Sequence, residues 1–285
     1  MIDPASVDWS TARRASYRVR QTFRYEYAQP ITDLNHRLVV IPPARFGDQR
    51  RTYHDILVEL ADVRRQERMD QFGNLIVDFF AREVPEAIEF VAEVDVERSA
   101  AVPNLLPHGW PPADWLLDPS PLTAADERIQ SAAEELSAGS AYGLDLADSI
   151  NDWVYGSLTY KHDMTGVRTT AAEALALGSG VCQDYAHVML AACRAAGLPS
   201  RYVSGHMVGQ GGTHAWVEVV LPAAGGRDAV AWAFDPTHAS RVGLGYVTIA
   251  VGRDYADVAP TSGTYRSGGK GRLSASKKVM LTEVI

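Results

Sequence analysis

Six prolines lie close together between residues 101 and 121, and this stretch constrains the fold more than any other. Proline fixes the backbone angle φ and lacks an N–H donor, so such a density excludes a helix or a central strand. The stretch also carries large apolar side chains, among them Trp110, Trp115 and Leu116, which a free linker would not need. We therefore expect residues 101–121 to be a Pro-rich crossing segment that packs on a surface and separates two domains.

A period of two dominates the residues before this segment, which is typical of strands with one buried face. The first run places four side chains on one face: Tyr17, Val19, Gln21 and Phe23. A later run stops at Pro42, and Asp70 to Asn74 supplies a turn between two expected strands. The pattern predicts an antiparallel, β-rich N-terminal domain over residues 13–100.

Helical spacing follows the crossing segment. Thr123 and Asp126 stand three residues apart, as in a capping box, and predict a helix that runs to Ser137. Three further helices are expected over residues 146–154, over 170–177 and from about Cys182 to Gly197. Strands are then expected over residues 201–206, 215–221, 230–234 and 246–251. Helices first and an antiparallel sheet second predict an α+β domain over residues 122–285.

Charge and hydropathy narrow the range of partners. The chain has 285 residues and a formal net charge of −8, which argues against nucleic acid as a partner. No run of about 18 apolar residues could cross a bilayer, and the first residues lack the basic and apolar regions of a signal peptide. We expect no membrane partner and a cytoplasmic location.

The two cysteines, Cys182 and Cys193, are expected to have different roles. They fall in one predicted helix, so their backbones lie ~16 Å apart, beyond the ~7 Å limit for a disulfide. Cys193 is in mid-helix, where a cysteine is usually an inert core residue. Cys182 begins the helix, where unpaired backbone N–H groups favour an anion, and the glycines before it would leave room for a substrate.

Two short motifs after Cys182 carry a candidate base and a candidate carboxylate. His214 opens an expected strand after a glycine-rich loop, and Asp235 precedes a proline that favours extended backbone. A thiol is a useful nucleophile only as thiolate. A helix N-terminus, an imidazole and a carboxylate that orients the imidazole would together produce and hold that thiolate.

The same three residues are also competent zinc ligands. The paired spacings that usually build a zinc site, such as Cys-x-x-Cys or His-x-x-x-His, are absent from the chain. We therefore expect neither a metal nor another cofactor, and interpret the order Cys, His, Asp as a nucleophile with its base.

Several segments resemble the transglutaminase-like core of the papain-type cysteine enzymes, in particular its bacterial branch. The resemblance rests on GSGVCQDYAHVMLAACRAAGLPSRYVSGH, THAWVEV and FDPTH. In the first half, TFRYEYAQPITDLNHRLVVIPP and DQFGN resemble the β-rich domain that precedes this core, and VGRDYADVAPTSGTY resembles its closing segment. The resemblance implies a β domain followed by helices packed on an antiparallel sheet.

The resemblance also implies roles for single residues. Cys182 would be the nucleophile, His214 the base and Asp235 the acid that orients the imidazole. Tyr160, just before the active-site helices, is a candidate second donor to the oxyanion, although a tyrosine that packs under a loop is the ordinary alternative.

The main functional hypothesis is a cysteine-dependent hydrolase that cleaves an amide or peptide bond through an acyl-thioester on Cys182. The substrate would be a peptide, a protein or a small amide. The alternative is a transglutaminase, which passes the same acyl group to an amine. A non-catalytic peptide-binding module is the alternative from a different class. The sequence does not name the substrate.

Overall fold

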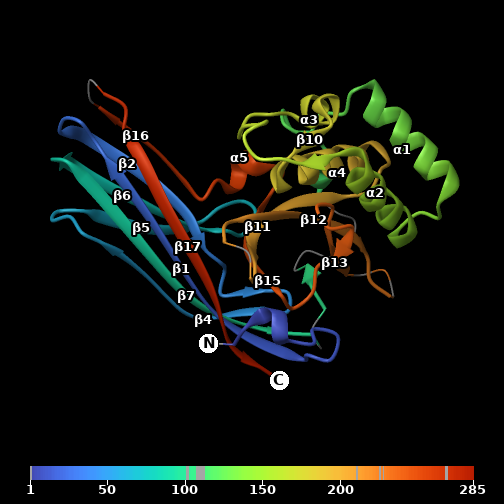
Figure 1. Ribbon diagram of the computed structural model, residues 1–285, viewed down its shortest axis with the longest axis horizontal. Helices are drawn as coiled ribbons and strands as arrows, with labels where there is room; N and C mark the ends of the chain where they lie inside the picture. The colour runs from blue at the N-terminus through green and yellow to red at the C-terminus, as the bar shows by residue number, and fades with distance from the viewer. Residues whose placement is uncertain are drawn as a thin grey trace.

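The computed structural model describes residues 2–100, 103–106, 113–209, 211–224, 226, 228–266 and 269–285. Two antiparallel sheets form one side of the molecule, and helices packed on a third sheet form the other (Figure 1). The predicted α+β class, with a β-rich first part and a helical second part, is confirmed. Within the described ranges no helix is long and apolar enough to cross a membrane.

The two sheets of the first half are built from nine strands. One contains, in spatial order, β17 (Arg272–Val284), β1 (Arg14–Glu26), β7 (Ala87–Ser99), β4 (Gln49–Val58) and β3 (Arg45–Phe46). The other contains β16 (Thr261–Arg266), β2 (Ile31–Ile41), β6 (Leu75–Val84) and β5 (Arg64–Met69). The rings of Phe79 and Phe90, one from each sheet, lie 5.0 Å apart between centroids, so the sheets share one core.

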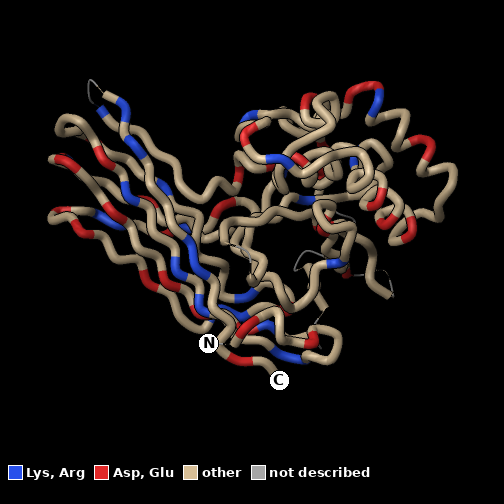
Figure 2. The backbone as a smooth tube through the Cα atoms, viewed as in Figure 1, with Lys and Arg blue, Asp and Glu red and all other residues tan. Residues whose placement is uncertain are grey.

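The alternating pattern of β1 decides which of its faces is buried. Its predicted inward residues, Tyr17, Val19, Gln21 and Phe23, are each at most 2 % exposed. Their neighbours Arg18 and Arg20 point outward and pair across the sheet with carboxylates of β7. Figure 2 shows Lys and Arg beside Asp and Glu along these strands. The turn before β6 also forms as predicted, because Asp70 accepts the N–H groups of Phe72 and Asn74.

The third sheet carries the second half. Its spatial order is β14 (Ser240–Arg241), β13 (Ala229–Asp235), β12 (His214–Pro222), β11 (Ser200–Met207) and β15 (Tyr246–Gly252), and β8 (Leu105–Leu106) also pairs with β13. The helices are α1 (Glu127–Gly139), α2 (Leu144–Ser157), α3 (Ala171–Leu177), α4 (Cys182–Ala195) and α5 (Tyr255–Val258). Short elements complete the list: β9 (Thr159–Tyr160), β10 (Ser179–Gly180) and the 3-10 turns Pro4–Ser6 and Asp114–Leu116. Helix α4 lies at the centre and packs on β11 and β12.

The start of α1 differs from the expected capping box. Asp126 is the N-cap, and its carboxylate accepts the N–H of Ile129, so the helix begins after it. Thr123 is fully buried and its hydroxyl accepts a hydrogen bond from the Arg194 guanidinium at 2.5 Å. Both residues can cap a helix, and the buried arginine determines which one does.

The end of the chain returns to the first half. Strand β16 pairs with β2, and β17 pairs with β1 along its whole length. The expected catalytic domain, residues 122–285, therefore ends in two strands that are hydrogen-bonded into the N-terminal sheets. A local sequence pattern indicates that these residues form strands. It does not indicate which strands they pair with, because pairing depends on long-range packing.

Two amide side chains connect the halves at the edge strand β15. Gln49 donates to the carbonyl of Thr248 at 2.8 Å and accepts its N–H at 2.9 Å. Asn74 does the same with Val251, at 2.7 and 2.8 Å. An edge strand has backbone groups without a strand partner, and buried ones must find partners elsewhere. The first half therefore supplies hydrogen-bond partners to the free edge of the third sheet at Thr248 and Val251.

Part of the crossing segment packs as expected. Leu116 is buried against Ala229 and Ala231 of β13, and Trp115 packs beside it. Residues 107–112, which include Trp110, lie outside the described residues, so the expectation for that tryptophan is untested.

Candidate active site

Helix α4 begins at Cys182 because the chain before it is held in place. Gly178 ends α3 in the left-handed conformation, with φ of +62°, and strand β10 then runs parallel to β9. The Asp184 carboxylate accepts the N–H of Val181 at 2.7 Å. A Cβ on Gly180 would lie 2.6 Å from that carboxylate. Gly180 thus leaves room for Asp184, whereas the sequence led us to expect room for a substrate.

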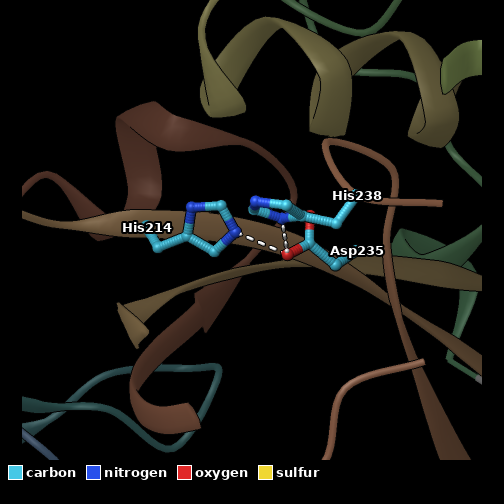
Figure 3. A group of neighbouring side chains, drawn as sticks. All are labelled: His214, Asp235 and His238. Carbon is cyan, nitrogen blue, oxygen red and sulfur yellow. Dashed lines mark hydrogen bonds and ion pairs between the residues drawn. The ribbon is translucent and has the colours of Figure 1, made fainter. Parts of the chain in front are cut away.

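His214 and Asp235 meet across neighbouring strands β12 and β13. Nε2 of His214 donates to Oδ2 of Asp235 at 2.7 Å (Figure 3). His214 is 5 % exposed and Asp235 is fully buried. The other ring nitrogen, Nδ1, points away from Asp235, and Cys182, which lines the same cavity, lies close enough to His214 to raise the pKa of the imidazole. The structure therefore brings the three residues together in the order Cys, His, Asp.

Asp235 accepts more hydrogen bonds than the sequence indicated. Oδ2 also accepts Nδ1–H of His238 and the hydroxyl of Tyr246, both at 2.8 Å. Oδ1 accepts the N–H of Thr237 at 3.0 Å. His238 could have been found, because it follows Asp235 by three residues in a turn. Tyr246 comes from another strand, and no local signal marks it.

These contacts determine the charges of Asp235 and His214. Burial alone would raise the pKa of Asp235, but the hydrogen bonds from His214 and His238 lower it below its ordinary value. Burial alone would lower the pKa of His214, but the hydrogen bond to Asp235 and the nearby Cys182 side chain raise it to about 9. At neutral pH the imidazole is therefore a cation beside Cys182.

Tyr160 lies next to the start of α4. Strand β9, which contains it, pairs with β10, so Tyr160 is opposite Gly180. Burial raises the pKa of its phenol above the ordinary value, and the backbone of Cys182 lies close enough to offset part of that rise. The phenol is therefore protonated at neutral pH. Its role as a donor to an oxyanion stays a prediction.

A cavity of about 1100 Å³ opens over these residues. Its lining residues are Tyr160, His162, Val181, Cys182, Gln183, Tyr202, Ser204, Gly211, Gly212, Thr213, His214, Ala215, Thr237, His238, Tyr255, Pro260, Ala275, Ser276 and Lys277. Most come from the second half, but the last three belong to β17. Both halves of the molecule therefore contribute to the walls of the cavity.

Cys193 differs from Cys182 as the helix position predicted. Both thiols are free, but Cys193 is fully buried and Cys182 is partly accessible. Burial raises the pKa of Cys193 to about 12. A protonated, inaccessible thiol is no nucleophile, so Cys193 is a core residue.

The group of side chains best placed for a metal among the described residues is not the one considered from the sequence. It consists of His214, Asp235 and His238, whose ligand atoms lie within 4.8 Å of one another. The carboxylate accepts an N–H from each imidazole, through Nε2 of His214 and Nδ1 of His238. Cys182 is not part of this group.

Comparison with known proteins agrees with this architecture. Residues 130–234 match the transglutaminase-like superfamily, and residues 17–97 match the bacterial transglutaminase-like N-terminal region. An uncharacterized protein of Mycobacterium leprae is 27 % identical over 94 % of this chain and 98 % of its own length. One from Mycobacterium tuberculosis is 28 % identical over 87 % of this chain and 86 % of its own.

The fold is also found in a crystal structure of a candidate cysteine protease from Cytophaga hutchinsonii. That chain is 22 % identical, with a TM-score of 0.76, and the match covers 95 % of this chain and 92 % of the other. Such a likeness shows the fold alone. The two sequence matches identify the chain as a transglutaminase-like superfamily protein whose core follows a bacterial transglutaminase-like N-terminal region.

Proposed function

We propose that the protein is a cysteine hydrolase that cleaves an amide or peptide bond through an acyl-thioester on Cys182. One observation carries the proposal: the partly accessible side chain of Cys182, at a helix N-terminus, lies beside a cationic His214, whose Nε2 donates to Asp235 at 2.7 Å. This arrangement provides a nucleophile, an acid for the leaving group and a carboxylate that fixes the ring.

In the first step the thiolate sulfur of Cys182 attacks the substrate carbonyl, and a C–S bond forms. The carbonyl oxygen becomes an oxyanion. The C–N bond then breaks, and the proton on Nδ1 of His214 passes to the departing nitrogen. The products of this step are a free amine and an acyl-thioester. His214 is now neutral and still held by Asp235 through Nε2.

The oxyanion needs donors that are already in place. The backbone N–H of Cys182 is one, and the Tyr160 hydroxyl is the second in this proposal. Tyr160→Phe removes that hydroxyl and should lower kcat by about 10²-fold, the usual cost of losing one oxyanion donor. An unchanged kcat would leave Tyr160 with a packing role only.

Water completes the cycle. His214 takes a proton from water through Nδ1, the hydroxide oxygen bonds to the acyl carbon, and the C–S bond breaks. Cys182 leaves as thiolate beside the imidazolium that has just formed. The resting charges of the site are thereby restored.

Trapping the thioester tests the proposal. The protein is incubated with a peptide mixture, quenched in acid and analysed by intact mass spectrometry, with hydroxylamine added in parallel to release the acyl group as a hydroxamate. We expect added mass on Cys182 that hydroxylamine removes. Cys182→Ala should abolish it, and Cys193→Ala is the matched control that should retain it.

The acceptor is identified in the same experiment. Turnover in ¹⁸O-labelled water should place one label in the new carboxylate. If a labelled amine enters the product and ¹⁸O does not, the protein is a transglutaminase. If Cys182→Ala cleaves amides at the wild-type rate, the thioester mechanism is wrong. If no thioester forms and bound peptides are retained, a binding module is favoured.

A further inference from the structure

A lysine from the far end of the chain reaches the cavity of Cys182. Lys277 belongs to β17, the edge strand of the first sheet, and lines the cavity. Its charge lies close enough to Cys182 and His206 for each pair to interact electrostatically. Nothing in the thioester chemistry described above uses this residue.

The position of Lys277 breaks the pattern of its strand. Residues opposite each other in an antiparallel pair point to the same face. Leu281 is opposite Tyr17 and Val279 is opposite Val19, both buried residues of β1. Lys277 is opposite Gln21, which is 2 % exposed. A strand that points apolar side chains inward therefore points an ammonium to the same side where it passes the cavity.

Within the part of the chain that the structure describes, no acidic group neutralises this ammonium, because Lys277 forms no ion pair there. The Phe23 ring makes a cation–π contact with it, 6.0 Å from Nζ. None of the described residues that line the cavity is Asp or Glu. Burial lowers the pKa of Lys277 to about 8, so the group is a desolvated cation for much of the time at neutral pH. A partly buried charge without a partner suits an anion supplied by a ligand.

We propose that Lys277 binds a carboxylate of the substrate, so that the protein selects amides whose acyl part carries a negative charge near the scissile bond. This inference rests on the proposed function, because it assumes that the substrate acylates Cys182. It assigns a specificity role to the N-terminal sheet, which supplies β17. The same ammonium would disfavour a protonated lysine as acyl acceptor, which is consistent with water in that role.

Inward-pointing charge on an edge strand has another use, since it discourages pairing with further strands. That role predicts self-association when the charge is removed and no change at Cys182. The substrate role predicts a change in the rate at which Cys182 reacts with charged reagents. The two are therefore separable.

Alkylation of Cys182 by iodoacetate and iodoacetamide tests the inference without any turnover. The two reagents share one leaving group and differ in one negative charge. The rate ratio, iodoacetate over iodoacetamide, is normalised to that of glutathione. In Lys277→Met we expect this ratio to fall about 10-fold, because a nearby cation no longer attracts the anionic reagent. Lys277→Arg should retain it.

Lys278→Met is the matched control, because Lys278 is exposed, next in sequence and opposite Arg20 on the other face. Its ratio should equal that of the wild type. Near-ultraviolet circular dichroism checks that each variant is folded, and Lys277→Gln replaces the Met variant if that one is not. A ratio that stays within about 2-fold of wild type in the folded neutral variant overturns the inference.

Chromogenic anilides identify the source of the carboxylate. N-acetyl-α-glutamyl-p-nitroanilide carries it on the side chain, and N-acetyl-γ-glutamyl-p-nitroanilide carries it at the α position. N-acetyl-glutaminyl-p-nitroanilide is the neutral control. We expect kcat/KM for one of the two acidic anilides to exceed the control by about 10-fold, and Lys277→Met to remove that excess.

The two assays separate the failure of this inference from the failure of the proposed function. If no amide is cleaved but the alkylation ratio still depends on Lys277, the anion site stands and hydrolysis is wrong. If all anilides are cleaved equally and the alkylation ratio is indifferent to Lys277, hydrolysis stands and the anion site is wrong.

Discussion

The ion pairs on the outer face of β1, in the first half of the molecule, and the ion pair between β11 and β12, in the second half, use charged side chains in opposite ways. On the first sheet, pairs such as Arg20 with Glu93 lie in solvent, with 54 % and 35 % of the side chains exposed. In the second half, Arg201 and Glu218 form a pair at 2.6 Å with 7 % and 3 % exposed. An exposed pair contributes little to stability, whereas a buried charge that loses its partner is costly. Charge therefore covers the outer face of β1 and is built into the interior at β11 and β12, while each half also holds a pair of the other kind, Arg98 with Asp48 in the first and Arg241 with Asp148 in the second.

Breaking the buried pair should have the largest effect. Glu218→Gln leaves the Arg201 guanidinium buried without a counter-charge and weakens the hydrogen bond that Asn104 donates. We expect the free energy of unfolding to fall by about 3–5 kcal/mol, measured by urea denaturation. A loss below about 1 kcal/mol would mean that the buried pair contributes no more to stability than an exposed pair.

The buried carboxylate of the site should serve chemistry more than stability. Asp235→Asn removes the charge that raises the pKa of His214 to about 9. The imidazolium persists below its pKa, so the alkaline limit of kcat/KM should move from about 9 towards lower pH. At pH 7.5 we expect activity to fall about 10²-fold, or about 2.7 kcal/mol. A pH–rate profile measures both; an unmoved alkaline limit would contradict the prediction.

Acid should weaken the second half more than the first. Burial lowers the pKa of His187 and His206 in the second half, and of His36 in the first, to about 4. A folded pKa below the unfolded value of about 6.5 means that stability is complete above pH 6.5 and declines as pH falls to 4. Each histidine should contribute a slope of about 1.4 kcal/mol per pH unit.

Hydrogen exchange measured between pH 6.5 and 4.5 can follow this loss strand by strand, after correction for the intrinsic rates. Protection should decline earlier in β11, which carries His206, than in β6 of the first half. Equal decline in both strands would mean that the two halves unfold as one unit at acid pH.

The smallest effect belongs to the exposed pairs. Arg20→Met removes the partner of Glu93 but keeps most of the aliphatic stem. We expect the free energy of unfolding to change by less than about 1 kcal/mol, with the difference shrinking in 1 M salt. A salt-independent loss as large as that of Glu218→Gln would show that the first half also depends on specific charge pairs.

Local sequence patterns predicted the structural features that depend only on neighbouring residues. The inward face of β1, the turn at Asp70 and the start of a helix at Cys182 each follow from a few neighbouring residues, and each is confirmed. The N-cap of α1 was misplaced because Thr123 is held by Arg194, a residue far along the chain. A capping motif describes a local preference, and a buried cation can override it.

Contacts between residues that are far apart in the sequence could not be predicted from local patterns. The pairing of His214 with Asp235 was predicted from the resemblance to the transglutaminase-like core, and the structure places the two residues in contact. Tyr246 and Lys277 reach the same neighbourhood only because β15 and β17 return to it. Neither residue has a pattern that distinguishes it from other tyrosines or lysines. The positions of Tyr246 and Lys277 follow from strand pairing, which depends on the packing of the whole core.

The pairing of β1 with β17 also has a consequence for synthesis on the ribosome. Strand β1 emerges early, and its partner is made only after the intervening sheets and helices. At about 5–20 residues per second this interval lasts roughly 10 to 50 s, during which β1 keeps an open edge. Lys277 arrives with the same late strand. Closure of the first sheet and completion of the cavity are therefore a single event, and we expect a nascent chain that lacks β17 to have neither.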